Sequence, residues 1–222
     1  MNLLRDSLHY IEENPDRFWD AVLVHVELSL YSLLIALALF IPLGIFAARS
    51  QKIGPAIIGF ISAARVVPSI AVLFLLFPYR QEIGDLVPFW PRAFVISLIA
   101  LIILAGPSLI INTDAGLRSI QPSVLENARG LGMSEFQMLR RVQIPLALPV
   151  IIAGIRTAAV EVVASAAVAA FVGANSLGRF LTSGLSLLDY SLLLVGAVPI
   201  ALMALFVEVT LAGVERVVTP PA

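Results

Sequence analysis

The residues of this sequence that could recognise a solute are polar groups set inside long apolar stretches. Arg65 and Glu161 are the two charges that a membrane interior would tolerate least, because a lone charge there costs at least about 2.5–3.5 kcal/mol. Counted at ~1.5 Å per residue from the starts of their stretches, both reach a similar depth, near the middle of a ~30 Å hydrocarbon core. The candidate site comprises Arg65, Pro68, Ser69, Thr157, Glu161 and Ser165.

Three interpretations of these two charges are open. Arg65 and Glu161 form a structural ion pair that sets how their helices pack, or they line a pathway for a zwitterionic solute, or they make no contact. Thr157 and Ser165 lie four residues to either side of Glu161, which places all three on one helix face. Pro68 interrupts the helix that carries Arg65, and broken helices at membrane depth are tolerated only against protein or a water-filled cavity.

Other kinds of site chemistry have almost no residues to work with. The sequence has no cysteine and only two histidines, His9 and His25, so neither a metal centre nor a histidine-activated serine is expected within the spans. His25 and Glu27 fall in the first turn of an apolar stretch, where we expect solvated or headgroup positions. The phosphate-binding pattern G-x-x-x-x-G-K-[ST] is absent, and the single lysine is Lys52. No cofactor and no enzymatic activity are expected of this chain.

The composition identifies the elements that must hold these residues. Hydrophobic residues make up 59% of the 222 residues, charged residues make up 13%, and the mean hydropathy is +0.98. These values are typical of integral membrane proteins, so membrane lipid is expected to surround the chain. The net charge of −1 argues against nucleic acid as a partner.

The apolar stretches predict an all-α membrane protein with about five transmembrane helices. The predicted spans are 22–48, 53–77, 93–111, 146–172 and 191–214. The second is interrupted at Pro68, and the third is expected to loosen at Gly106-Pro107. Six spans remain an alternative if the second or fourth stretch is a helical hairpin. Residues 1–21 are an amphipathic N-terminal segment, 22–215 the transmembrane domain and 216–222 a short tail.

Residues 112–149 contain the only long polar segment between these stretches. Pro122 suits a first helical turn, and Gly132 suits a left-handed helix end. Ser134, with Gln137 three residues on, predicts a capping box at the start of a second helix, which Pro145 is expected to end. The pattern favours an amphipathic helix pair at the membrane surface that docks against a partner.

This segment resembles the coupling motif of ABC importer permeases, which reads Glu-Ala-Ala, three residues, Gly, nine residues, Ile, one residue, Leu-Pro. The corresponding residues here are Glu126, Ala128, Gly132, Val142, Ile144 and Pro145, with Ser134 as the cap of the second helix. Asn127, Val142 and Ile144 depart from the motif, the last two conservatively. The flanking Val67-Pro68-Ser69 and Ala153-Gly154-Ile155-Arg156-Thr157-Ala158 resemble the osmoprotectant branch, whose solutes are glycine betaine, choline and carnitine.

The resemblance implies the permease fold with a cytoplasmic coupling loop, in a bacterial cytoplasmic membrane. It also implies three protein partners: a separate ABC ATPase that the loop contacts, an extracytoplasmic substrate-binding protein, and a second permease subunit, either identical or related. With the loop inside, five spans put the N-terminus outside and the C-terminus in the cytoplasm. Seven Lys and Arg residues then lie inside and five outside, which agrees with a positive-inside bias.

Two other functions are open. An ion-coupled secondary transporter would be expected to show an inverted internal repeat, and no second copy of the broken 53–77 pattern is visible. An ABC permease for another small solute, such as an amino acid, is the second alternative. The spans contain no cluster of aromatic residues of the kind that cages a quaternary ammonium group, so they do not identify the solute.

Overall fold

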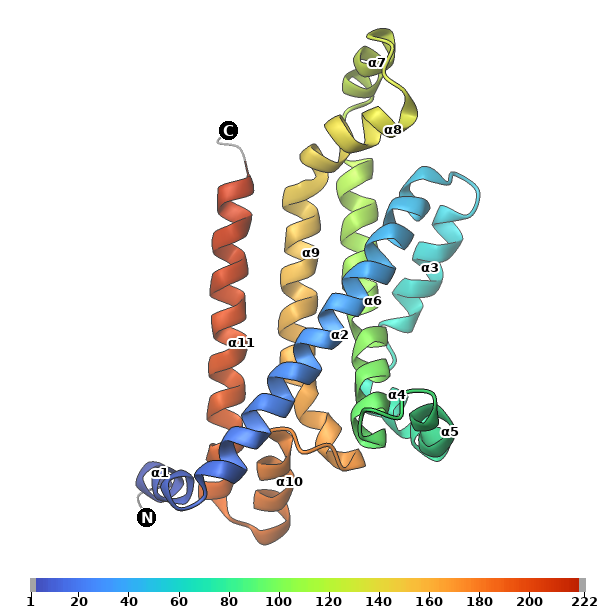
Figure 1. Ribbon diagram of the computed structural model, residues 1–222. Coiled ribbons are helices and arrows are strands. Elements are labelled where there is room, and N and C mark those ends of the chain that lie inside the picture. The colour runs from blue at the N-terminus through green and yellow to red at the C-terminus, as the bar shows by residue number, and fades with distance from the viewer. Residues whose placement is uncertain (1–2, 220–222) are drawn as a thin grey trace.

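The computed structural model describes residues 3–219, and these residues form an all-helical bundle without strands (Figure 1). The first two residues of the predicted N-terminal segment and residues 220–222 of the predicted tail lie outside the described part. The two helices of the polar segment extend beyond one end of the bundle, while α1 (Leu3–Glu13) and α10 (Gly178–Leu187) lie at the other end.

Four helices are long and apolar enough to cross a membrane. They are α2 (Pro15–Arg49), α6 (Arg92–Arg118), α9 (Ile144–Ser165), which continues at both ends into shorter helical turns, and α11 (Tyr190–Val218). A bent pair supplies a fifth span, because α3 (Gly54–Ala64) meets the helical segment Ser69–Asp85 at 90°. The prediction of about five transmembrane helices is confirmed.

The bend in the second span follows from its proline. Pro68 has extended backbone angles, φ −62° and ψ 139°, and stands just before α4 (Ser69–Leu76). Because proline has no N–H and disfavours helical geometry in the residue before it, α3 ends at Ala64 and a short turn carries Arg65 to Val67. The remaining short elements are η1 (Phe77–Tyr79), α5 (Arg80–Asp85), α7 (Pro122–Gly130), α8 (Glu135–Met138), the π turn η2 (Leu139–Gln143) and the 3₁₀ helix η3 (Ala166–Val172).

Helix α6 is the centre of the bundle, since 72% of its most apolar stretch is buried, compared with 22% in α2 and in α11. It packs between α2 and α9, and Leu28, Leu109 and Val162 from these three helices meet in the main core. The crossing of α6 and α9 depends on Gly154, where a Cβ atom would lie only 2.5 Å from Cβ of Asn112. This close approach is the role expected of a small residue in a membrane helix.

Two helices run further than the sequence indicates. Gly106-Pro107 does not loosen α6, which continues to Arg118, because a neighbouring helix can compensate for the hydrogen bond that a buried proline lacks. Pro145 does not end the helical path either. It lies in the first turn of α9, and the π turn η2 joins α8 to α9 without a break. The predicted loop 112–149 therefore includes the last turns of α6 and the first turns of α9.

The position of His25 contradicts the prediction that its side chain is solvated or lies at the headgroups. Its side chain is fully buried rather than solvated, and its Nε2 lies 3.0 Å from the carbonyl oxygen of Val163 in α9. Glu27, two residues on, is exposed as expected. The structure starts α2 at Pro15, a full two turns before the predicted span, so His25 lies well inside the helix and faces its neighbour.

Candidate functional site

The coupling loop, residues 119–143, has a geometry that its own sequence sets. Gly132 has φ +75°, and the N–H groups of Gly132 and Met133 donate to the carbonyls of Arg129 and Ala128 at 2.9 and 3.2 Å. This is the Schellman arrangement that satisfies the last carbonyls of a helix. The left-handed stop at Gly132 is confirmed, and it turns the chain from α7 into α8.

The predicted capping box at the start of α8 is also present. Ser134 Oγ accepts from the N–H of Gln137 at 3.3 Å, and the N–H of Ser134 donates to Gln137 Oε1 at 2.9 Å. Two otherwise unpaired donors of the helix end are satisfied in this way. Both ends of the turn between α7 and α8 are thus specified by local hydrogen bonds.

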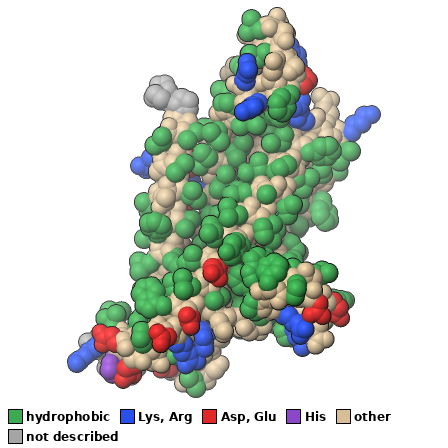
Figure 2. All heavy atoms as spheres, viewed as in Figure 1, with side chains coloured by type: hydrophobic (Ala, Val, Ile, Leu, Met, Phe, Trp, Pro, Cys, Tyr) green, Lys and Arg blue, Asp and Glu red, His purple; other side chains and the backbone are tan. Residues whose placement is uncertain are grey.

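The loop presents apolar side chains outward at its tip. Leu131 is 80% exposed and Phe136 is 68% exposed, whereas Ala128 and Met138 are buried against the rest of the loop. Figure 2 shows Lys and Arg side chains gathered around this end of the molecule, with hydrophobic side chains covering the middle. An exposed apolar tip beside basic side chains is typical of an interaction surface.

The side chain of Glu126 is exposed and has no hydrogen-bond or ion-pair partner among residues 3–219. Val142 and Ile144 are half-buried in and after the π turn, and Pro145 is exposed. The charged contacts of the loop belong instead to Glu135, which pairs with Arg49 of α2 at 2.8 Å and with Arg129 of α7 at 3.6 Å.

The second candidate region is a cavity of about 260 Å³ between the bent span, α6 and α9. Arg65, Ser69 and Glu161 all line it, so the structure brings together three of the six predicted residues from two distant parts of the chain. Pro68 contributes the bend beside it. The remaining two lie elsewhere: Thr157 is exposed and bonds its own helix at Ala153 O, 3.0 Å away. Ser165 lines a small adjoining gap with Ser69.

Glu161 is not paired with Arg65. Its Oε2 accepts a hydrogen bond from Ser108 Oγ at 3.0 Å, and the ion pairs among residues 3–219 do not include these two residues. The structure therefore provides one cation and one anion on the same cavity without joining them as the predicted pair. Ser108 is the residue that sequence reasoning missed, although its position after Pro107 in an apolar helix is a signal of a polar neighbour.

The intramembrane ion pair that does form involves Arg156. Its Nη1 lies 3.1 Å from Glu208 Oε1, and its Nε lies 3.4 Å from Glu215 Oε2, both on α11. These contacts tie α9 to α11 and leave Glu161 to the cavity. The positions of Arg156 and Glu208 inside apolar stretches were visible in the sequence, but not which partner each would meet.

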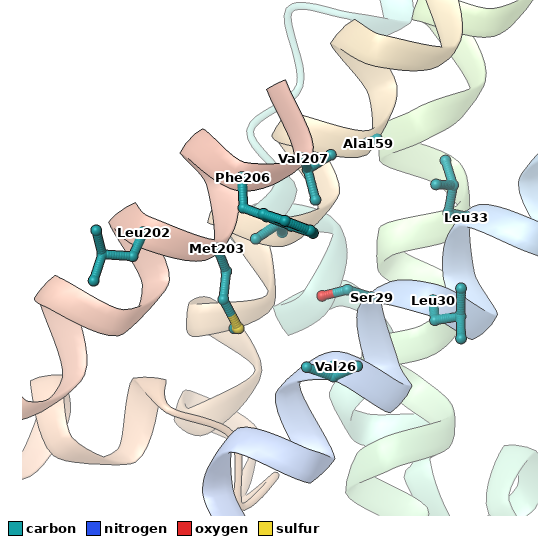
Figure 3. A pocket seen from close by; sticks show the side chains of 10 residues that line it. Val26, Ser29, Leu30, Leu33, Ala159, Leu202, Met203, Phe206 and Val207 are labelled. Carbon is teal, nitrogen blue, oxygen red and sulfur yellow. The ribbon is translucent and has the colours of Figure 1, made fainter. Parts of the chain in front are cut away.

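A larger hollow of about 430 Å³ lies between α2, α9 and α11 (Figure 3). Its lining is apolar apart from Ser29, whose hydroxyl donates to the carbonyl of His25 at 2.8 Å. Because it offers no charged group, it is a poor site for a zwitterionic solute. The smaller cavity with Arg65 and Glu161 is therefore the better candidate for solute contact.

Comparison with known proteins identifies the family of this chain. Residues 40–220 match the family described as binding-protein-dependent transport system inner membrane component. The carnitine transport permease protein OpuCB of Listeria monocytogenes is 35% identical, over 96% of this chain and 93% of that protein. The osmoprotectant import permease protein OsmW of Salmonella typhimurium is 33% identical, over 97% and 98%.

A solved structure shares the fold. The chain resembles one in an inward-facing structure of the MetNI methionine ABC transporter, with a TM-score of 0.81 and 18% identity over 92% of this chain and 97% of that one. In this family the permease is a transport component that works with a separate ATPase and a substrate-binding protein. The chain belongs to the inner-membrane components of binding-protein-dependent transport systems, the multi-pass permease subunits of ABC importers.

Proposed function

We propose that this permease translocates a small quaternary-ammonium osmoprotectant of the glycine betaine, choline or carnitine kind. The carrying observation is the cavity that presents Arg65 and Glu161 without pairing them. A betaine or carnitine has one positive and one negative group, and a site with one unpaired group of each sign complements it. The names of the two relatives, with 35% and 33% identity across nearly the whole chain, support the same class of solute.

The test is transport by the assembled importer. The chain is reconstituted in liposomes with its ATPase and binding protein, and ATP-driven accumulation of radiolabelled glycine betaine, choline, carnitine and methionine is compared. Accumulation of a quaternary-ammonium solute is expected. Accumulation of methionine alone supports the amino-acid alternative, and accumulation driven by an ion gradient without ATP supports a secondary transporter.

In the same proposal, the coupling loop binds the ATPase subunit. Leu131 and Phe136 enter a groove of that subunit, and Glu126, free of internal partners, meets a basic or N–H donor there. Glu126→Ala is expected to lower ATPase stimulation and uptake while the protein still inserts in the membrane. Unchanged stimulation in this variant and in Gly132→Val contradicts the assignment.

The orientation follows from the loop: the N-terminus is outside and the C-terminus is in the cytoplasm. The sequence contains no cysteine, which allows single-cysteine labelling without background. In intact cells, a membrane-impermeant maleimide is expected to label Ser186→Cys in α10 and to spare Ser123→Cys in α7 until the cells are opened. The reverse labelling pattern overturns the orientation.

A second permease subunit completes the pathway in this proposal, because the cavity is only partly enclosed by α3, α4, α6 and α9 of one chain. The partner is an identical copy or a related permease. Differently tagged copies of this chain are expected to co-purify in the first case, and a second permease is expected in the purified complex in the other.

A further inference from the structure

Helix α2 contacts the coupling loop at one end and the fourth span near its other end. At its C-terminal end, Arg49 Nη2 lies 2.8 Å from Glu135 Oε2 of α8, which leads through η2 directly into α9. Nearer its N-terminal end, His25 Nε2 lies 3.0 Å from Val163 O, close to the end of α9. The two residues are 24 positions apart, which corresponds to about 36 Å of helix. Figure 1 shows α2 running obliquely across the bundle between these two points.

The contact at His25 lies where the fourth span changes its helix type. The N–H of Ala166, where η3 begins, donates to Val162 O. The next carbonyl, that of Val163, accepts a hydrogen bond from the ring of His25. Ala166 O accepts a further side-chain bond from Ser176 Oγ at 3.1 Å. A change from α to 3₁₀ bonding within a helix is a frequent place for a hinge.

This junction is next to the candidate solute cavity. Glu161, which lines the cavity and accepts from Ser108, precedes Val163 by two residues. A shift of α2 against the junction therefore moves the segment that carries Glu161. His25 is fully buried, so the geometry of this contact is set by the position of α2 and not by solvent.

The C-terminal end of α2 is also held by a hydrogen bond from a neighbouring helix. Arg118 of α6 donates from Nη2 to Ala47 O at 3.0 Å and from Nε to Asp114 at 2.8 Å. Arg49 is thus presented from a fixed helix end to Glu135. The Arg49–Glu135 pair is exposed and contributes little to stability, so its value lies in position rather than in folding energy.

We propose that α2 is a strut that carries movement of the coupling loop to the α-to-3₁₀ junction of the fourth span, with Arg49 and His25 as the positioning residues at its two ends. The inference rests on the proposed contact of the coupling loop with the ATPase. The loop is joined covalently to α6 and α9, and the Glu135–Arg49 pair adds α2 as a third element that moves with it. The His25–Val163 contact then delivers that movement to the segment of α9 that carries Glu161, from the face opposite the cavity.

The first experiment exchanges the charges of the exposed pair. In the reconstituted importer, the measured quantity is solute transported per ATP hydrolysed. Arg49→Glu and Glu135→Arg are each expected to lower this ratio about two- to fivefold, in line with the small energy of exposed pairs. The double exchange is expected to restore most of it, because the pair between α2 and α8 forms again while the longer contact of residue 135 with Arg129 is lost. Because both side chains are on the surface, these variants keep the fold.

The matched control is the Arg92–Asp85 pair, which is also exposed, is 3.0 Å long and lies at the opposite end of the bundle. Exchanging its charges is expected to leave the ratio unchanged. Failure of the double exchange at Arg49 and Glu135 to restore coupling overturns the strut. So does an equal loss in the control.

The second experiment tests the other end. His25→Leu removes the donor to Val163 O and is expected to lower the ratio about five- to tenfold. His25→Gln places an N–H near the position of Nε2 and is expected to recover most of it, which a purely space-filling role does not predict. Size-exclusion profiles of the purified complexes identify variants that fail to assemble. If the His25 variants fail, the charge exchange at Arg49 and Glu135 tests the proposal by itself.

The decisive measurement combines the two ends. Residues ~36 Å apart normally act additively, whereas two ends of one strut do not. The loss in Arg49→Ala with His25→Leu is expected to be close to that of the larger single variant. Additive losses overturn the strut. If Gly132→Val leaves ATPase stimulation intact, the proposed docking of the loop fails instead, which is a separate result.

Discussion

The coupling loop and the membrane cavity are built in opposite ways. The loop turns at Gly132 and starts α8 at Ser134 through hydrogen bonds between residues no more than five apart. The cavity brings together Arg65 from the turn after α3, Ser108 from α6 and Glu161 from α9, which meet only after packing. The turn of the loop is therefore specified by residues close together in the sequence, whereas the cavity in the bundle depends on which helices are neighbours.

The largest expected effect tests the local specification of the loop. Gly132→Val is expected to reduce uptake at least about tenfold, because a β-branched residue is strongly disfavoured at φ +75° and the turn must open. Gly130→Val is the control, since a side chain at either glycine meets no atom within 4 Å and only Gly132 has positive φ. Equal losses in the two variants contradict a backbone origin. The measurement is uptake at matched membrane abundance.

The next effect tests the packed site. Glu161→Ala is expected to lower uptake about tenfold, mainly through a higher KM, because the anionic side of the cavity is lost and Ser108 loses its acceptor. Glu161→Gln retains an acceptor for Ser108, so its folded yield is expected to match that of the wild type while its uptake stays low. Glu27→Gln, an exposed site on α2, serves as the control. Normal uptake by Glu161→Ala removes the cavity from the pathway.

A smaller effect distinguishes the Arg156–Glu208 ion pair, which forms, from the predicted Arg65–Glu161 pair, which does not. Arg156→Ala and Glu208→Ala are expected to be non-additive by about 0.5–3 kcal/mol in thermal unfolding, since the two side chains touch at 3.1 Å. Arg65→Ala and Glu161→Ala are expected to be additive, because no contact joins them. Recovery of folded yield in the Arg65/Glu161 double variant would indicate that they do pair in the membrane.

The smallest effect concerns the cap of α8. Ser134→Ala is expected to destabilise the loop by about 1 kcal/mol and to reduce ATPase stimulation a few-fold, whereas Ser134→Thr keeps the hydroxyl and most of the activity. Gln137→Ala removes only the reciprocal bond and is expected to fall between them. A Ser134→Ala variant with full stimulation shows that the partner, rather than the cap, orders this helix.

Features whose causes lie within a few residues of one another could be predicted from the amino-acid sequence. Long apolar stretches require helices in lipid, Pro68 requires a break because it cannot donate, and Gly132 with Ser134 requires a turn and a new helix start. The same local rules misjudged Pro107 and Pro145, because α6 continues past the first and the helical path from α8 through η2 to α9 continues past the second. A proline shows where a bond is lacking, not whether the surroundings replace it.

Which polar groups meet depends on how the helices pack. Arg156 rather than Arg65 takes carboxylate partners, because α11 packs along α9 and brings Glu208 and Glu215 to it. Glu161 turns to Ser108 because α6 is the central helix, and His25 is buried because α2 crosses the end of α9. Depth along a span can be counted from sequence, but the rotation of each helix and its choice of neighbour are set by close packing at positions such as Gly154.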